Sequence, residues 1–170
     1  GRRATVAVAA SREDGAPVDW DALDAQFARV SERYGFTDTT RVVQQIMLPV
    51  QTPDWVRDVS TTLVDPAYPL MHRTPLRDGR WFREDDTALL APPVVISEAL
   101  WEVYGSPPLA THPELTLTGD LGGTYQIVGV TPKQSVWDTQ KSLYLLYDTY
   151  RARVDSFPAN AYVVREVWVP

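Results

Sequence analysis

The chain has 170 residues, 44% of them hydrophobic, which is enough to bury one core or two small lobes that share one. Its 16 lysines and arginines against 22 aspartates and glutamates give a formal net charge of -6. This balance disfavours nucleic acid and anionic membrane surfaces as partners, because both attract clustered positive charge. Cysteine is absent, which excludes disulfides, thiolate catalysis and cysteine-based zinc sites.

No uninterrupted apolar run approaches the roughly 20 residues that a membrane-spanning helix needs. The chain also opens without the charged and apolar stretches that make a signal peptide. We therefore expect a chain that is soluble as it stands.

The first part of the chain predicts a strand followed by a helix. Residues 3–10 alternate in the manner of a strand, and a turn at residues 11–17 follows. Asp19 is placed to cap the helix, and Gly35 is placed to end it. The apolar side chains of this helix recur at spacings of three and four, on one stripe that must lie on something broad and apolar. They are Trp20, Leu23, Phe27, Val30 and Tyr34.

Residues 41–48 predict a second strand, whose far end Pro49 should weaken. Strand, helix and strand over this length make a βαβ-sized unit if the two strands are parallel, with the helix as a right-handed crossover. The apolar stripe of the helix would then cover one face of a small sheet.

The middle of the chain predicts shorter elements. Residues 55–64 form a strand-like run, and the two prolines within residues 65–69 break it. Ser97 should cap a helix at residues 98–104 that Gly105 closes. Short sequential hairpins favour antiparallel pairing in this part. Further strands are expected at residues 115–118, 125–130, 143–147 and 161–169, the first two forming a hairpin.

Neither histidine has the surroundings of a metal site. His72 and His112 lie in proline-flanked segments without a partner at a ligand spacing. Glu84, Asp85 and Asp86 are three adjacent acids whose side chains diverge, as in a solvated loop or a helix start. A metal at the histidines would need acids from distant parts of the chain, whereas the three adjacent acids could bind a cation but are more typical of a solvated segment.

The remaining candidates for chemistry are also weak. Asp19, Asp21 and Asp24 lack the spacing of a calcium loop and suit the positive end of the helix that they begin. The glycine-rich loop at residues 119–123 leads to neither a lysine nor a helix, so it does not have the pattern of a phosphate loop. No Gly-x-Ser-x-Gly elbow is present. We therefore expect no catalytic residues, no metal and no cofactor.

The six tryptophans are many for a chain of this length. Packing in the core explains those in predicted helices, Trp20 and Trp101. Trp55 and Trp137 instead lie in polar, loop-like surroundings, and they are the candidates to contact a partner or a ligand.

Three short runs in the middle of the chain follow one another in a characteristic order. The first is a glycine turn leading to an aromatic residue and an acid, and the second is a buried strand that runs into a helix. The third is a short apolar strand around a glycine. Their defining residues are Gly79, Arg80, Phe82, Asp85, Asp86, Val94, Val95, Ile96, Ser97, Tyr104, Gly105, Ile127, Val128, Gly129 and Val130. In this order and spacing the runs resemble the extracytoplasmic domain of MacB-type ABC transporter permeases, within the wider FtsX-like permease family.

The resemblance implies a domain on the outer side of the cell membrane, between the first and second transmembrane helices of a permease. In that family a cytoplasmic ABC ATPase drives the membrane helices, and the outer domain transmits or receives the movement, for export or for an outside partner. The motif residues would be structural and not catalytic. The implied partners are the ATPase, a second permease subunit in a dimer and an extracytoplasmic adaptor protein.

We predict an α+β fold with two lobes. A small βαβ-type, porter-like lobe next to the membrane would comprise residues 1–50 and 160–170, and a β-rich lobe inserted in it would comprise residues 51–159. The first and last strands should then meet in one sheet, with the two ends of the chain side by side. Gly79, which follows an aspartate, should adopt a positive φ.

Two other functions are also compatible with the sequence. One is a free-standing secreted binding module that uses surface tryptophans, and the other is an enzyme with carboxylate chemistry. Apolar segments of about 20 residues on both sides of the chain in the full reading frame would favour the permease. A signal peptide alone would favour the secreted module.

Overall fold

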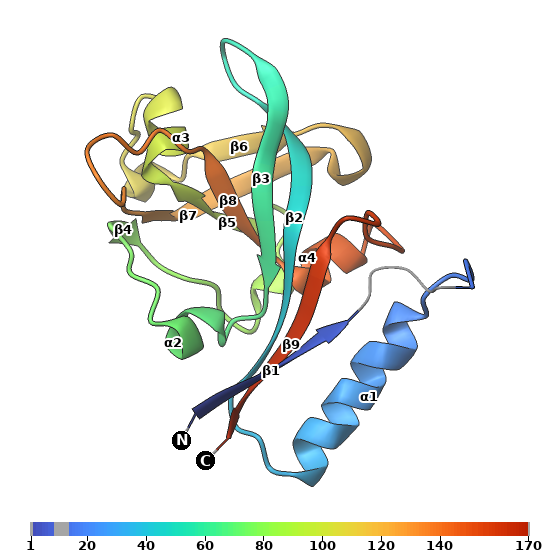
Figure 1. Cartoon of the computed structure of the whole chain (residues 1–170). Coiled ribbons are helices and arrows are strands. Elements are labelled where there is room, and N and C mark those ends of the chain that lie inside the picture. The colour runs from blue at the N-terminus through green and yellow to red at the C-terminus, as the bar shows by residue number, and fades with distance from the viewer. Residues whose placement is uncertain (1, 9–13, 170) are drawn as a thin grey trace.

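A computed structural model describes residues 2–8 and 14–169 (Figure 1). The predicted strand at residues 3–10 and the turn at residues 11–17 therefore lie partly outside the described residues. The elements follow in the order β1 (Arg2–Val8), α1 (Trp20–Arg33), β2 (Thr39–Gln51), β3 (Val56–Val64), α2 (Tyr68–His72), β4 (Asp78–Gly79), β5 (Pro93–Ser97), α3 (Glu98–Val103), β6 (Glu114–Leu117), β7 (Gly123–Thr131), β8 (Ser142–Leu146), α4 (Tyr147–Arg151) and β9 (Tyr162–Val169).

A single sheet runs through the whole molecule. Its strands are ordered β1-β9-β2-β3-β8-β5-β7-β4, and β6 pairs with β2 and β7 beside this path. The sheet, with few and short helices around it, confirms the predicted α+β class. The division into a lobe of residues 1–50 with 160–170 and an inserted lobe of residues 51–159 stays a prediction, since the strand pairing crosses from one part to the other.

The first and last strands meet as predicted. β1 and β9 are antiparallel neighbours, with Arg2 opposite Val169. β2 lies antiparallel on the other side of β9, with Thr39 opposite Val167, so β1 and β2 run parallel to each other. Helix α1 connects these two parallel strands, which is the predicted βαβ unit with β9 inserted between its strands. Paired residues lie about 5 Å apart, and both chain ends lie at one end of the molecule (Figure 1).

Strand β2 is longer than predicted and pairs with three strands, β9, β3 and β6. Its first half pairs with β9 as far as Gln44, whereas β3 pairs with Val43 and then again from Ile46 onward. Between Val43 and Ile46 the register to β3 shifts, and Gln45 has a φ of 64°, as in a β-bulge. The expected weakening at Pro49 is wrong, because the strand continues and the Pro49 carbonyl accepts a hydrogen bond from the Thr118 N–H at 3.0 Å.

Antiparallel pairing was predicted for the middle of the chain, but the observed pairing there is mixed. β2–β3, β6–β7 and β5–β8 are antiparallel, whereas β5–β7 and β3–β8 are parallel. Long connections make the parallel pairs possible, since α3 and β6 lie between β5 and β7 in the chain.

Two helices, α2 and α4, were not predicted. Prolines at positions 66 and 69 indicate a break, but Pro69 lies in the first turn of α2, where its missing N–H costs nothing. The tyrosines of α4 are typical of a strand, and Tyr147 and Tyr150 are buried against Phe157 in the core. Tertiary packing therefore decides the conformation of both segments.

Helix α1 is capped and ended as predicted, but only its beginning is buried. The Asp19 side chain accepts a hydrogen bond from the Ala22 N–H at 3.0 Å. Trp20 is 2% exposed and packs edge-to-face on Phe157, with the two ring centroids 4.7 Å apart. Val30, near the other end of the helix, is 39% exposed. Toward its C-terminal end the helix leaves an apolar hollow of about 380 Å³ above β1 and β9. The predicted stripe therefore covers the sheet only in part.

The glycines of the family motifs meet in the fold. Gly79 pairs with Gly129 where β4 crosses β7, and Gly79 has the predicted positive φ of 78°. A Cβ on Gly79 would lie 2.1 Å from the Val128 carbonyl oxygen, and one on Gly129 would lie 2.5 Å from the Arg80 carbonyl oxygen. Neither position has room for a side chain. The glycines of two motifs about fifty residues apart thus allow one close contact between the backbones of β4 and β7.

We expect Gly79→Ala to destabilise the fold by about 2–4 kcal/mol, because a strained left-handed backbone and a clash with a main-chain oxygen add together. Gly105→Ala is the matched control, since Gly105 has a φ of 81° but no atom within 4 Å of an added Cβ. The control should lose only about 1–2 kcal/mol. Urea denaturation of both variants measures the difference, and equal losses would contradict the close contact at Gly79.

Candidate functional site

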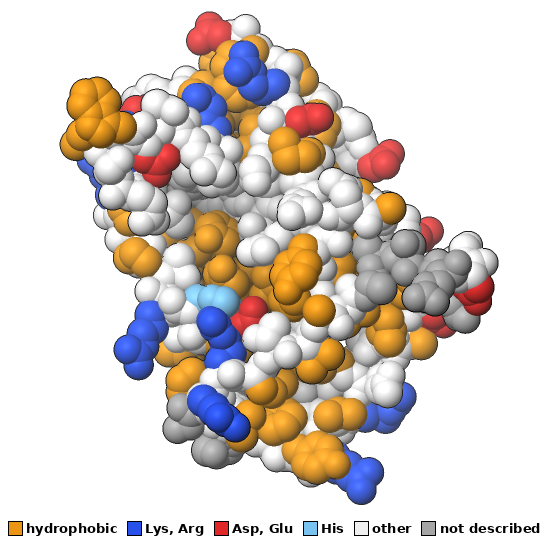
Figure 2. Space-filling model, in the orientation of Figure 1, with side chains coloured by type: hydrophobic (Ala, Val, Ile, Leu, Met, Phe, Trp, Pro, Cys, Tyr) orange, Lys and Arg blue, Asp and Glu red, His pale blue; other side chains and the backbone are white. Residues whose placement is uncertain are grey.

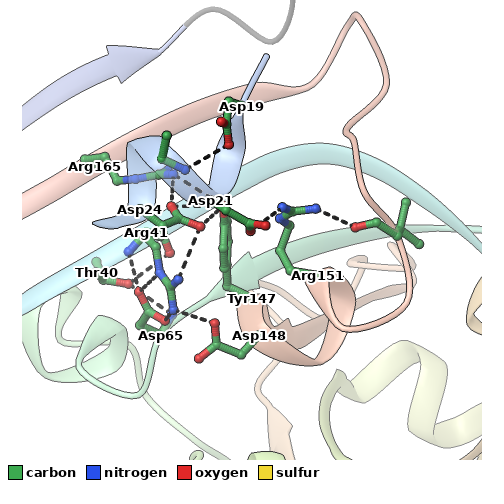
Figure 3. A network of polar contacts seen from close by, with 12 residues as sticks. Asp19, Asp21, Asp24, Thr40, Arg41, Asp65, Tyr147, Asp148, Arg151 and Arg165 are labelled. Atoms are coloured by element: carbon green, nitrogen blue, oxygen red, sulfur yellow. Dashed lines mark hydrogen bonds and ion pairs between the residues drawn. The ribbon is translucent and has the colours of Figure 1, made fainter. Parts of the chain in front are cut away.

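A network of charged side chains holds α1 against the sheet (Figure 3). It draws one to three residues from each of five places that are distant in the sequence: the helix itself, β2, the end of β3, α4 and β9. Its members that touch one another are Asp21, Asp24, Arg41, Asp65, Tyr147, Asp148, Arg151 and Arg165.

Asp24 is the centre of this network. Its carboxylate accepts a hydrogen bond from Arg165 Nη2 at 2.6 Å and one from the Tyr147 hydroxyl at 2.9 Å. Arg41 Nη1 lies 3.6 Å away on the same carboxylate. The Arg165 side chain is only 6% exposed, so its charge depends on Asp24 for compensation.

Arg41 connects the start of β2 to Asp65 at the end of β3 and to Asp148 of α4. Its Nε and Nη2 donate to the two carboxylate oxygens of Asp65 at 2.8 and 2.6 Å, in a bidentate pair, and Nη2 also donates to Asp148 at 2.9 Å. The guanidinium lies over the Tyr147 ring, 4.1 Å from its centroid. Burial would lower the pKa of Arg41, but the hydrogen bond and charge of Asp65, with Asp148 and Asp24, raise it overall. Burial raises the pKa of Tyr147 to about 12, so this hydroxyl stays a neutral donor to Asp24.

A second ionic contact lies on the opposite face of β9. Glu166 follows Arg165 directly, so its side chain points to the other side of the strand. It is 5% exposed, and it accepts from His72 Nε2 at 2.6 Å, with Arg3 Nε 3.5 Å away. The His72 ring stacks on Tyr68 at 4.1 Å, within α2. Two consecutive residues of β9 therefore hold α1 on one face and α2 on the other.

A cleft of about 640 Å³ opens beside the first network. Its walls combine apolar side chains with carboxylates, and Arg41 pairs with three of those acids, Asp24, Asp65 and Asp148. No nucleophile with an adjacent base is assembled there, and the described residues hold no group of three or more histidines and acids that could bind a metal. The walls include Asp24, Phe27, Asp38, Arg41, Asp65, Leu70, Phe82, Arg83, Glu84, Leu146 and Asp148.

The first family motif builds a buried ion pair. Arg80 Nη1 lies 3.0 Å from Asp86, whose carboxylate also accepts the Arg83 N–H at 2.8 Å. Asp86 is 3% exposed and Phe82 is 6% exposed, whereas Asp85 is exposed and makes no side-chain cap. Of the two acids matched to the motif, Asp86 is therefore the one that the fold uses.

The second motif builds a helix start and a helix end. The Ser97 hydroxyl accepts the Leu100 N–H at 3.3 Å, which caps α3 as predicted, and it also accepts the Ser142 N–H at 3.0 Å. Gly105 has a φ of 81° directly after the C-cap residue Tyr104. The same serine thus fixes α3 and the beginning of β8.

The two candidate contact tryptophans lie in different surroundings, and neither lines the cleft. Trp55 closes the β2–β3 hairpin, packs partly on the core, and lies under the Arg57 guanidinium at 4.7 Å. Trp137 lies in the loop between β7 and β8 and is 86% exposed. Only Trp137 is free to contact another molecule with most of its ring.

Sequence reasoning did not identify the ionic network. Asp24 was assigned only to the helix start, and Arg41 was assigned only to a strand. A usable signal exists in Arg165 and Glu166, an adjacent pair of opposite charges inside an otherwise apolar run. Buried charges of this kind need partners, but the sequence does not say which ones.

Comparisons with known proteins identify structures with a similar fold. Among solved structures, the chain is similar to the periplasmic region of MacB from Actinobacillus actinomycetemcomitans, with a TM-score of 0.65 and 15% identity over 86% of this chain and 64% of that one. It is also similar to the extracellular domain of the ABC-type transporter YknZ from Gram-positive bacteria, with a TM-score of 0.67 and 13% identity over 98% of this chain and 83% of that one. A domain of a putative permease protein from Porphyromonas gingivalis aligns with a TM-score of 0.56 and 18% identity, over 84% of this chain and 60% of that one.

The first two of these structures are a periplasmic region and an extracellular domain, and a family model decides the membership. Residues 2–167 match the model of the MacB-like periplasmic core domain, so the chain belongs to that family. A comparison with curated proteins finds no significant match. Among the described residues, none of the helices has the length and apolar character needed to cross a membrane.

We expect Asp24→Ala to lower the free energy of unfolding by about 3–5 kcal/mol, because it leaves the buried Arg165 charge without its carboxylate. Asp21→Ala is the control on the same helix. The Asp21 side chain is 91% exposed and pairs with Arg151 at 2.8 Å, a surface contact worth about 0–1 kcal/mol. Denaturant unfolding of both variants decides the matter, and similar losses at the two positions would show that the buried network does not anchor α1.

Proposed function

We propose that this domain transmits movement between the membrane helices of an ABC permease and a partner outside the membrane. A cytoplasmic ATPase would supply the movement through the permease. The family supports the outer position, since its characterised structures are periplasmic or extracellular regions of such transporters. Export itself and the molecule exported belong to the whole protein, of which the domain is one part.

The observation that carries this proposal is the pairing of the chain ends. Arg2 lies opposite Val169 in the β1–β9 ladder, so helices attached to both ends would enter the domain at one place. Backbone hydrogen bonds join the two strands along their whole length, so a pull or rotation at the ends reaches both strands together.

Strand β9 also has the contacts needed to pass this movement on. Through Arg165 it holds Asp24 of α1, and through Glu166 it holds His72 of α2. Both contacts are largely withdrawn from water, where an ion pair cannot be exchanged cheaply for hydration. A displacement of β9 would therefore carry the two helices with it instead of sliding past them.

The partners follow from the same proposal. The ATPase would act from the cytoplasm, a second permease subunit would complete a dimer, and an adaptor protein would bind on the outer side. The domain itself would do no chemistry, in keeping with a family of transporter domains.

A distance measurement in the full permease tests the proposal. Spin labels on cysteines at Tyr34 and Leu90, which are 63% and 101% exposed, report the position of the C-terminal end of α1 relative to the loop before β5. The chain has no cysteine of its own, so only cysteines elsewhere in the permease need replacement. We expect the distance to shift between the nucleotide-free and the vanadate-trapped transporter, and Asp24→Ala to reduce that shift.

A label pair outside α1, at Val56 beside the turn of the β2–β3 hairpin and at Leu90 before β5, is the control and should not change. Both positions are exposed, at 58% and 101%. Identical distance distributions for the Tyr34–Leu90 pair in the two nucleotide states would contradict a role in transmission.

A further inference from the structure

The loop between β7 and β8 presents two large apolar side chains to solvent. Within residues 132–141, Val136 is 83% exposed and Trp137 is 86% exposed. Figure 1 places this loop near α3, at the upper left, whereas both chain ends lie at the bottom. In Figure 2, hydrophobic side chains project from the surface over the same region. An indole so fully in water gives the fold almost no burial energy.

Internal hydrogen bonds fix the loop beneath these side chains. The Asp138 carboxylate accepts the backbone N–H groups of Gln134 at 3.1 Å and Gln140 at 3.0 Å, on either side of the tip. The Asp138 N–H donates to the Ser135 carbonyl at 3.1 Å. The two backbone hydrogen bonds lower the pKa of Asp138, so the carboxylate holds them at any neutral pH. The loop therefore displays Trp137 on a preformed turn.

The base of the loop is tied to α3. Lys133 Nζ lies 2.7 Å from Glu102, and the Lys133 N–H donates to Glu98 at 3.4 Å. Beside this contact is a hollow of about 260 Å³, which also reaches Lys141. Lys141 makes no ion pair with any of the described residues, and it and Lys133 are the only lysines of an acidic chain. The loop thus combines an exposed aromatic side chain with a lysine four residues further along the chain, whose Nζ donates to the Thr139 carbonyl at 3.5 Å and to no carboxylate of the described residues.

We propose that residues 132–141 are a docking site for a folded protein whose surface offers an apolar socket to Trp137 and a carboxylate to Lys141. The inference rests on the proposed function, since it places this partner on the outer side of the permease. Tryptophan is the residue most enriched at interface positions that dominate binding energy. A preformed loop also avoids the ordering cost that a flexible one would pay on association. The unpaired ammonium then favours an acidic rim on the partner.

A lipid surface is the main alternative for an exposed tryptophan, and the structure disfavours it. Membrane-surface binding uses several apolar side chains on one face together with a group of cations. This loop offers two apolar residues, and the chain has a net charge of -6. The loop also lies away from the chain ends, which the proposed function places at the membrane.

Cysteine labelling in intact cells tests the inference, with a membrane-impermeant maleimide as the probe. The full permease carries one added cysteine, Val136→Cys in the loop or Leu90→Cys as an equally exposed control. In the native envelope we expect labelling at position 136 to be about tenfold slower than in the purified permease, as for a site occupied most of the time. Labelling at position 90 should be the same in both.

A second pair of variants tests the charge. Lys141→Glu should restore fast labelling at position 136 in cells, because it places like charges at the contact, whereas Lys141→Arg should keep the protection. An unchanged melting temperature in both variants shows that the loop is still folded.

Three results would overturn the inference. Equal labelling rates at position 136 in cells and in the purified permease would show that nothing covers the loop. Protection by vesicles of phosphatidylethanolamine and phosphatidylglycerol, with no other protein present, would assign the loop to lipid. A failure of the maleimide to reach either position in intact cells would instead refute the outer location, and with it the proposed function as well.

Discussion

The buried charges of β9 are the constraint on which the arrangement of the domain depends. Arg165 and Glu166 are 6% and 5% exposed, and each must find an opposite charge because neither can reach water. The alternation of a strand sends them to opposite faces, where Arg165 meets Asp24 of α1, and Glu166 meets Arg3 of β1 and accepts a hydrogen bond from His72 of α2. The last strand therefore fixes the position of the first helix and of a helix from the middle of the chain.

The continuous sheet explains how a domain with a weakly covered helix remains one body. β2 joins β9 along its first half and β3 from Val43 to its end, with a bulge around Gln45 in the β2–β3 ladder. β8, β5, β7 and β4 follow beyond β3 in the sheet, so the ends of the chain and its middle share one hydrogen-bonded frame. Apolar packing then concentrates around Trp20 and the strands beneath it.

The charged network and the exposed loop have different parts in the function that we propose. The network pairs its own charges, Arg41 with Asp65 and Arg165 with Asp24. The loop at residues 132–141 has the opposite character, because Trp137 is 86% exposed and Lys141 makes no ion pair with any of the described residues. In this proposal the charged network would transmit the movement, and the loop would bind the partner.

The sequence by itself determined the local features whose causes are local. Periodicity and capping residues gave α1 and α3, alternation gave most strands, and a glycine after Asp78 implied the positive φ at Gly79. The ordered motifs also pointed to the permease family. Only the tertiary structure decided which of Asp85 and Asp86 is buried, that α2 and α4 are helical, and that two strand pairs are parallel. It alone brought Asp24 to Arg165, since a buried charge requires a partner but its chain position does not specify which one.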